Sequence, residues 1–330
     1  MGPPVSVGEL VLRGPRSLFV QSWAPADMRG GGTINADGFG VAWWRRAEVG
    51  LDGVRDAVTR YRNAAPIWTD PAVAEVLGQL ESRSVLASVR SATVGMPIER
   101  AACAPFTDEH WAFSHNGVVP DWRPTLLAVL ADLNAVVGPE WPDVGASGAG
   151  APVVADTPVG VGSGGPPTGD DAGMVDRAVG ARLAPTLGKR PVRHDGAALF
   201  GSAAVLLEAE ALTDSAALWV LLRGLLTTIH PVGPITSPAD ALRLLVTTVR
   251  HHQPAARLNL LLGDGDHLWA TTCWHALSVL VADDFTVLAS EPYDDDPRWQ
   301  PIADRQIVAA APGACTITDL ELPVTERVRS

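Results

Sequence analysis

The order of strand-like and helix-like segments is the feature that most constrains how this chain can fold. From Val5 to about Leu133, short apolar runs alternate with Gly-rich turns, as in antiparallel strands, and a helix is expected at 71–80. Two strongly helical segments follow, and strand-like runs then return. The helical segments are 215–229 and 237–252, and the later runs are 256–273, 276–282 and 286–292. This order predicts an α+β fold, with sheets covered by helices in one domain spanning 1–330.

Local signals fix two of these boundaries. Ser237 is expected to cap the second helical segment, with Pro238 at its first position. The Asp264-Gly265 pair predicts a hairpin turn between two of the later strands. By contrast, residues 138–193 consist mainly of Gly, Ala, Pro and Val without periodicity, so we expect a flexible, disordered insertion with one short helix near 171–185.

Charge and composition exclude several classes of protein. The chain has 25 Lys and Arg against 37 Asp and Glu, and this net charge of -12 argues against a nucleic-acid partner. It has neither a secretory leader pattern nor a run of 18 apolar residues, so we expect a cytoplasmic protein with no membrane partner. Three widely spaced cysteines, Cys103, Cys273 and Cys315, predict neither a disulfide framework nor a zinc site, and no metal is expected.

The stretch WAFSHNGVV, residues 111–119, places Asn116 and Gly117 between two apolar runs. One interpretation is a type I′ hairpin turn, which Asn-Gly pairs favour. The other is an oxyanion hole for acyl transfer, in which the Asn116 side-chain amide and the Gly117 backbone N–H point at one place. The sequence alone leaves both open.

Two charged residues have similar alternatives. Arg90 ends an apolar strand in SVRSATVG, where it either forms a surface ion pair or grips a substrate carboxylate with its planar fork. Asp214 in LTDSAALW precedes a helical pattern, so an ordinary helix N-cap at Thr213 or Asp214 competes with a binding role.

The order of the motifs is more specific than any one of them. NADGFGVAW, VRSATVG, APF, SHNG, TDS, LLGDG and ASEPYDDDPRW follow one another along the chain. This series resembles the class II glutamine amidotransferases, which are N-terminal nucleophile hydrolases, over about residues 2–133 and 206–311. Within that family it is most similar to the γ-glutamyl-hercynylcysteine sulfoxide hydrolases of actinobacterial ergothioneine biosynthesis. The resemblance implies a four-layer αββα sandwich of two mostly antiparallel sheets flanked by helices.

The resemblance also implies roles for single residues. Arg90 would hold the α-carboxylate of a glutamyl group, Asp214 its α-ammonium, and Asn116 with Gly117 the oxyanion. Each role suits the charge or donors of its side chain. Further candidates for substrate contacts are Asp37 in NADGFG and the nearby Trp44. The family's usual Glu after TDS is Ala216 in this chain.

The nucleophile is the main departure from the family pattern. Members begin with Met followed by Cys, and the exposed cysteine attacks while its own α-amine serves as base. This chain begins MGPPVSVGELVL, which is similar to the segment several residues after that cysteine. We therefore expect a sequence shortened before its nucleophile, and a pseudoenzyme is the alternative. Cys103 lies inside the chain without a free α-amine, so we interpret it as a small core residue.

The implied reaction is hydrolysis of a small-molecule γ-glutamyl amide, without a metal or organic cofactor. A hercynyl leaving group carries a trimethylammonium, which binds well over aromatic rings. Trp23, Trp43, Trp44 and Trp111 are candidates for that contact, and packing in the core is the alternative. Two other functions stay open: a glutaminase domain that feeds ammonia to a partner synthase, and a non-catalytic protein that binds glutamyl groups.

Overall fold

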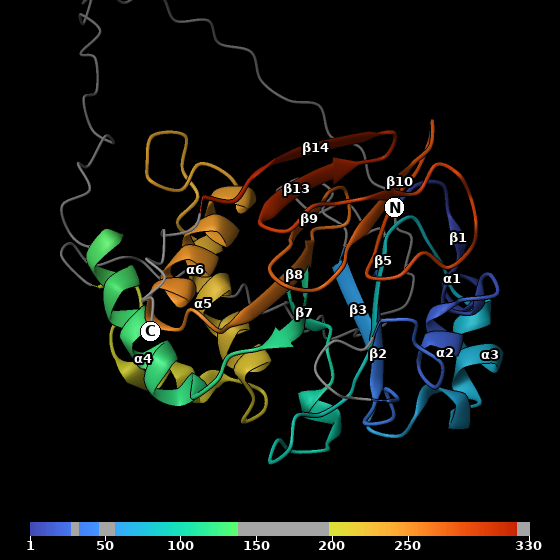
Figure 1. Ribbon diagram of the computed structural model, residues 1–330, viewed down its shortest axis with the longest axis horizontal. Coiled ribbons are helices and arrows are strands. Elements are labelled where there is room, and N and C mark those ends of the chain that lie inside the picture. The colour runs from blue at the N-terminus through green and yellow to red at the C-terminus, as the bar shows by residue number, and fades with distance from the viewer. Residues whose placement is uncertain (28–32, 46–56, 138–197, 322–330) are drawn as a thin grey trace, which may run out of the picture.

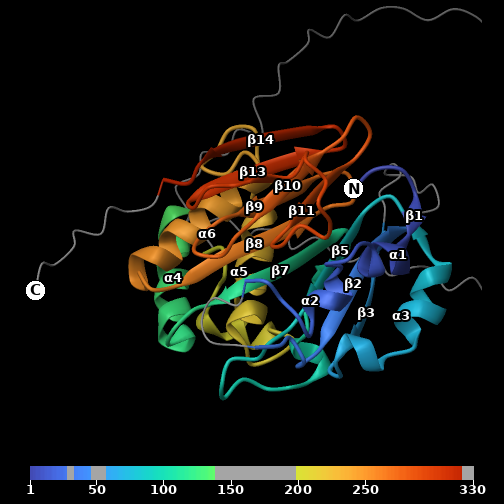
Figure 2. The ribbon, with the colours of Figure 1, turned by 45° about the vertical axis from the view of Figure 1, so that its right-hand side comes forward.

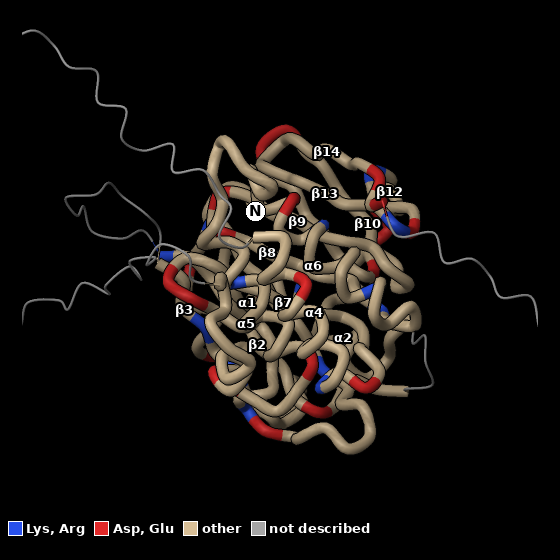
Figure 3. The backbone as a smooth tube through the Cα atoms, turned by 90° about the vertical axis from the view of Figure 1, so that its left-hand side faces the viewer, with Lys and Arg blue, Asp and Glu red and all other residues tan. Residues whose placement is uncertain are grey.

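The computed structural model describes residues 1–27, 33–45, 57–137 and 198–321 (Figure 1). The insertion expected at 138–193, with its short helix, lies outside the described residues. Within them, no helix combines the length and the apolar character needed to cross a bilayer. Acidic and basic residues are both scattered along the backbone in the view of Figure 3.

Two antiparallel sheets form the centre of the molecule. The large sheet has six strands in the order β14-β13-β9-β8-β7-β6, and the small sheet has three in the order β3-β2-β5. The strands of the large sheet are β6 (Phe106–Asp108), β7 (Trp111–Val118), β8 (Arg257–Gly263), β9 (Leu268–Thr271), β13 (Gln306–Ala311) and β14 (Ala314–Asp319). Those of the small sheet are β2 (Phe39–Arg45), β3 (Ala57–Asn63) and β5 (Val85–Val89).

Shorter strands lie beside these sheets. They are β1 (Val5–Ser6) with β4 (Glu81–Ser82), and β10 (Ser278–Val281) with β11 (Thr286–Ala289) and β12 (Gln300–Pro301). The helices are α1 (Val7–Leu12), α2 (Leu18–Gln21), α3 (Ala72–Glu75), α4 (Trp122–Val136), α5 (Asp214–Leu226) and α6 (Pro238–His252). Short 3₁₀ turns are η1 (Ile67–Thr69), η2 (Leu77–Gln79), η3 (Arg100–Ala102) and η4 (Ala203–Glu208).

Alternation along the strands sorts the apolar side chains into three buried layers. Because neighbouring residues of a strand point to opposite faces, each sheet buries one set of side chains on each side. Against α1 to α3 the small sheet packs Phe39, Val41 and Trp43. Between the sheets lie Ala42, Trp44, Leu86 and Ala112. Against α4 to α6 the large sheet packs Phe113, Leu258, Leu260 and Leu262. The expected four-layer α+β sandwich is confirmed (Figures 1 and 2).

The predicted start of the second helical segment and the predicted turn at Asp264-Gly265 are both confirmed. Helix α6 begins at Pro238, and the Ser237 hydroxyl caps it by accepting from Asp240 N. The turn at Asp264-Gly265 joins β8 to β9, with Gly265 at φ 101°. The helix expected at 71–80 is split into α3 and η2, and the backbone of α1 at Gly8 lies closely against Gly78 of η2.

The hairpin interpretation of Asn116-Gly117 is wrong. Strand β7 runs through this pair to Val118, and Asn116 and Gly117 lie opposite Asn259 and Leu258 of β8. Glycine is required here for another reason, since a Cβ at position 117 would collide with the main-chain carbonyl of Arg257. Close approach of two backbones therefore explains a residue that the sequence suggested as a turn.

Candidate active site

Arg90 and Asn116 reach the same end of the space between the two sheets. Leu86 of β5 and Ala112 of β7 pack together in that space, and β5 and β7 are in contact. Both strands begin beside Trp44, whose backbone N–H donates to Ser84 O and whose indole donates to His110 O, so they run in the same direction. Asn116 lies four residues beyond Ala112, and Arg90 lies four residues beyond Leu86, just past the end of β5. Because strand side chains repeat every two residues, both point toward the space that Leu86 and Ala112 fill. The structure therefore brings the two candidates to one mouth, one from each sheet.

Asp37 shapes the backbone around Arg90. Its N–H donates to Arg90 O at 2.9 Å, and its carboxylate accepts from Ala92 N at 2.7 Å. Arg90 N in turn donates to Gly38 O at 2.8 Å. The Asp37 side chain is thus engaged with the loop that follows β5, where it orients Arg90.

Asp214 joins helix α5 to the end of β7. It is the first residue of α5, the Thr213 hydroxyl caps the helix, and Asp214 is only 6% exposed. Its carboxylate accepts from Val119 N and from Ser215 N, both at 2.8 Å. The helix N-terminus favours the negative charge at this position.

The backbone N–H of Gly117 points to the edge of β7 that lies beside Asp214. Leu258 N donates to Cys273 O on the β9 side, so the odd-numbered residues of β8 face β7. Asn116 therefore exchanges hydrogen bonds with β8, while the N–H of Gly117 points to the opposite edge. Strand β6 begins opposite Phe113, so it does not extend alongside this part of β7. Gly117 thus faces the same edge as Val119, which Asp214 binds.

His115 and Ser215 belong to the same structure, and sequence reasoning missed them. His115 Nε2 lies 2.9 Å from Arg257 O, and its Nδ1 lies 3.0 Å from the Ser215 hydroxyl. A carbonyl can only accept, so Nε2 carries a proton, and Nδ1 contacts the Ser215 hydroxyl, which also lies within donating distance of Asp214 Oδ1 at 3.4 Å. The imidazole therefore ties β7 to β8 and to α5. In the sequence, the only signal for His115 and Ser215 is that they are neighbours of Asn116 and Asp214.

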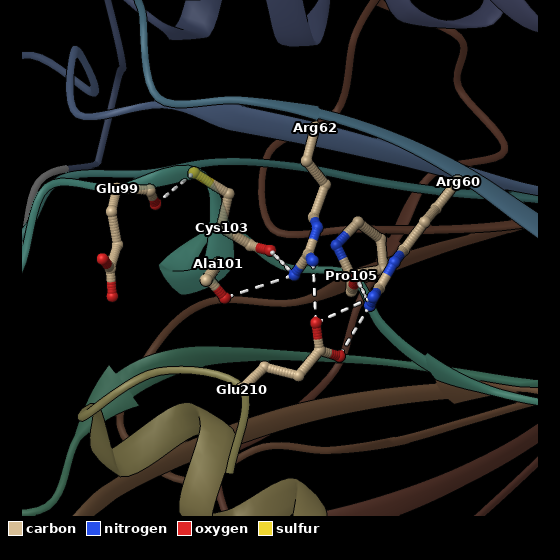
Figure 4. Close-up of polar contacts among 7 residues, drawn as sticks. All are labelled: Arg60, Arg62, Glu99, Ala101, Cys103, Pro105 and Glu210. Atoms are coloured by element: carbon tan, nitrogen blue, oxygen red, sulfur yellow. Dashed lines mark hydrogen bonds and ion pairs between the residues drawn. The ribbon is translucent and has the colours of Figure 1, made fainter.

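An ion-pair network fixes the segment that leads into α5 (Figure 4). Arg60 binds both carboxylate oxygens of Glu210 at 2.8 Å, and Arg62 binds one of them at 2.8 Å. Arg62 also donates to the carbonyls of Ala101 and Cys103. Burial alone would raise the pKa of Glu210, but the hydrogen bonds and charges of the two arginines outweigh it, and the pKa is lowered. Burial, followed by the charge of Arg60, lowers the pKa of Arg62.

The cysteines of this chain are not set up as nucleophiles. Cys103 is fully buried, and its thiol contacts the carbonyls of Asn63 and Glu99 at 3.4 and 3.5 Å. Burial raises the pKa of Cys103, and it does the same for Cys273 and Cys315. Nucleophilic cysteines need the opposite shift, because the thiolate is the reactive form.

The candidate tryptophans divide by burial. Trp44 is 3% exposed, and its indole N–H donates to His110 O at 2.7 Å. It pairs with β5 near Ser84, about 20 Å along the strand from Arg90. Trp43 is also buried, and Trp111 packs on Trp269 at the far end of β7. Among the four, Trp23 alone is strongly exposed, at 41%.

Among the described residues, no three His, Cys, Asp or Glu side chains are grouped as a metal ion would need. The polar groups of the candidate residues are a guanidinium, a carboxylate, a side-chain amide and a backbone N–H. This set suits a zwitterionic amino-acid head and the oxyanion of an acyl transfer.

Comparison with known proteins shows the family to which the chain belongs. Residues 15–138 match the family described as glutamine amidotransferases class-II. The chain belongs to this family and is an amidohydrolase that acts on linear amides. It is 33% identical to the γ-glutamyl-hercynylcysteine sulfoxide hydrolase of Mycolicibacterium smegmatis over 97% of both chains. It is 34% identical to the Mycobacterium tuberculosis protein of the same name, over 97% of this chain and 94% of the relative. A glutamine aminotransferase class-II domain protein from Silicibacter pomeroyi has 17% identity and a TM-score of 0.47, with 97% and 96% covered.

Proposed function

We propose that this protein hydrolyses the γ-glutamyl amide bond of γ-glutamyl-hercynylcysteine sulfoxide, releasing glutamate and hercynylcysteine sulfoxide. The proposal is supported by the positions of Arg90 and Asn116, four residues beyond the contacting residues Leu86 and Ala112, and by the bond of Asp214 to Val119 N at the end of β7. The hydrolase relatives at 33–34% identity support the choice of substrate.

Each of these groups takes one part of the substrate. The Arg90 guanidinium pairs with the α-carboxylate, and the Asp214 carboxylate receives the α-ammonium. The Asn116 amide and the Gly117 N–H then stabilise the negative charge that develops on the γ-carbonyl oxygen. Removing one such donor typically costs about 3 kcal/mol of transition-state stabilisation.

The nucleophile in this proposal arrives on an added strand beside β5. Among the described strands β5 pairs only with β2, so its other edge is open. The hydrogen bond from Arg90 N to Gly38 O shows that even-numbered residues face β2. By alternation, the backbone groups of Val85, Ala87 and Val89 face the open edge.

The first residues of the chain are already aligned with that edge. Met1 exchanges two hydrogen bonds with Thr286 of β11, and Gly2 N donates to Arg83 O at 2.8 Å. Successive residues therefore bond to strands on opposite sides, as a strand inserted between β5 and β11 does (Figure 2). Continued upstream along β5, such a strand would reach the level of Arg90 after about seven residues, since Arg83 and Arg90 are seven apart.

A cysteine at the start of that strand completes the reaction. Its thiolate attacks the γ-carbonyl, its α-amine takes the thiol proton and passes it to the departing amine, and a thioester to the glutamyl group forms. Water then attacks the thioester and releases glutamate. Arg90 and Asp214 hold both ends of the glutamyl head throughout, which turns a collision into a positioned reaction.

The test is a chain extended by a family-like strand that begins Met-Cys, compared with the same chain carrying Ala in place of that Cys. We expect glutamate release from γ-glutamyl-hercynylcysteine sulfoxide with the Cys version alone. Asn116→Ala in the extended chain should lower kcat by about 100- to 1,000-fold with KM little changed. Turnover that is indifferent to Asn116 would refute the oxyanion assignment.

The same assay separates the other two functions. Efficient release of ammonia from free glutamine, with a synthase subunit that co-purifies, would favour a glutaminase domain. Glutamate binding without hydrolysis by the extended Cys chain would favour a non-catalytic glutamyl-binding protein.

A further inference from the structure

Two half-exposed tryptophans form an aromatic corner near the proposed site. Trp23 follows α2 and is 41% exposed, and Trp68 lies in η1 and is 37% exposed. Their ring centroids are 5.9 Å apart and the rings are nearly perpendicular, at 89°. Phe19 packs edge-on against Trp23 from behind, at 5.0 Å and 88°. The two indoles are therefore held in place while a large part of each stays in solvent.

The corner lies at the end of the small sheet that carries Arg90. Ser22 O, next to Trp23, accepts from Asn35 N at 2.6 Å, and two residues further on Asp37 bonds to the Arg90 backbone. Trp68 comes five residues after Asn63, which pairs with Phe39 at the start of β2. Both rings thus adjoin the part of the chain that orients the glutamyl-binding arginine.

Two carboxylates bind chain segments close to the tryptophans, with Asp70 two residues after Trp68. Asp70 accepts from the hydroxyl of Tyr61 and the amide of Asn63, both at 2.7 Å. Burial alone would raise the pKa of Asp70, but these hydrogen bonds outweigh it, and the pKa is lowered, so the group stays charged. On the other side, Glu291 accepts from the backbone N–H groups of Ala26 and Asp27, three and four residues after Trp23.

This combination suits one class of ligand. A quaternary ammonium donates no hydrogen bonds, so aromatic faces and dispersion recognise it better than a hydrogen-bonding pocket does. Perpendicular indoles offer it two walls, and nearby carboxylates supply a negative potential. We propose that the Trp23–Trp68 corner binds the quaternary ammonium end of the substrate's leaving group. This inference rests on the proposed function, which supplies a substrate with a trimethylammonium.

The experiment uses this chain as it is and does not need turnover. Choline is titrated by calorimetry and by tryptophan fluorescence, with its neutral isostere 3,3-dimethylbutanol as the comparison ligand. We expect choline to bind more tightly than the neutral isostere, and Trp23→Leu and Trp68→Leu each to weaken choline binding by about tenfold. Trp122→Leu, at the first position of α4, is the matched control and should leave binding unchanged.

Equal binding of choline and the neutral isostere, or unchanged choline binding in both corner variants, would overturn the proposal. Glutamate binding is measured in parallel on the same variants, with Arg90→Gln as its own control. Loss of choline binding with glutamate binding intact supports the corner as a separate subsite. Absent glutamate binding in the unmodified chain counts instead against the proposed function, so the two failures are distinguishable.

Discussion

The two sheets carry the candidate site in different ways. In the large sheet, β7 is paired with β8 along the whole segment that holds Asn116 and Gly117, and His115 fastens it to α5. In the small sheet, Arg90 follows a strand that has a neighbour on one side only among the described residues. The part of the candidate site that holds Asn116 and Gly117 is therefore fixed by packing within the described residues. The part that holds Arg90 lies beside a strand edge with no partner among those residues.

Hydrogen exchange gives the largest expected contrast between the sheets. In this chain the amides of Val85, Ala87 and Val89, which face the open edge, should exchange fast, and those of Leu86 and Ser88 slowly. An added upstream strand should protect the first three by about 1,000-fold, since each would gain a partner in a cooperative sheet. Exchange measured by NMR residue by residue tests this, and equal rates for odd and even residues would show that the edge is not open.

A substitution at Gly117 tests the close approach of the β7 and β8 backbones. Gly117→Ala should lower the free energy of unfolding by about 3 kcal/mol, because the new Cβ meets the Arg257 carbonyl and neither backbone can move aside. The control is Gly78→Ala, where a Cβ meets no atom within 4 Å. Urea unfolding of both variants measures the difference, and a Gly117→Ala protein as stable as the control would contradict the packing described.

The Glu210 network links β3 of the small sheet to the segment that leads into α5, so its loss should loosen that contact. Glu210→Gln should cost about 2 kcal/mol, since it leaves two arginines, at 25% and 8% exposure, without their shared carboxylate. Glu208→Gln is the matched control, because its pair with Arg223 is more exposed and worth less.

This contribution should also depend on pH in a defined direction. The folded-state pKa of Glu210 lies below the ordinary value of 4.5, so the stabilisation is complete above that value. It is lost as the pH falls through the lowered pKa. The gap in unfolding free energy between the wild type and Glu210→Gln should therefore close in acid, and a constant gap would argue against an ionised Glu210.

Two substitutions at His115 test the hydrogen bonds that join β7 to β8 and to α5, and their expected effects are the smallest. Gln can replace the Nε2 donor to Arg257 O, and Asn can replace Nδ1 as the partner of the Ser215 hydroxyl. Each keeps one hydrogen bond and loses the other, so each should cost about 1 kcal/mol of stability. Thermal unfolding checks this, with Ser215→Ala expected to add little in the Gln variant. Full additivity of those two changes would show that the His115–Ser215 bond is absent.

Local signals allowed parts of the fold to be predicted, and distant contacts prevented the rest. Ser237 and Pro238 mark the start of α6 through bonds within one helical turn, so sequence suffices there. The need for Gly117 comes from a carbonyl 140 residues away at Arg257, and that contact is invisible in the sequence. Glu210 pairs with an arginine 150 residues earlier for the same reason. Trp44 is of a residue type that often contacts ligands, but it is buried between the sheets.

The alignment of Met1 and Gly2 between β11 and β5 has a consequence for biosynthesis. In the proposed arrangement, the strand that delivers the nucleophile is also the one that closes the small sheet. Its thiol stands beside Arg90 only after segments as distant as Val85 and Thr286 have come together. A partly synthesised chain would then have no catalytic activity, and activity would begin only after the whole domain has folded.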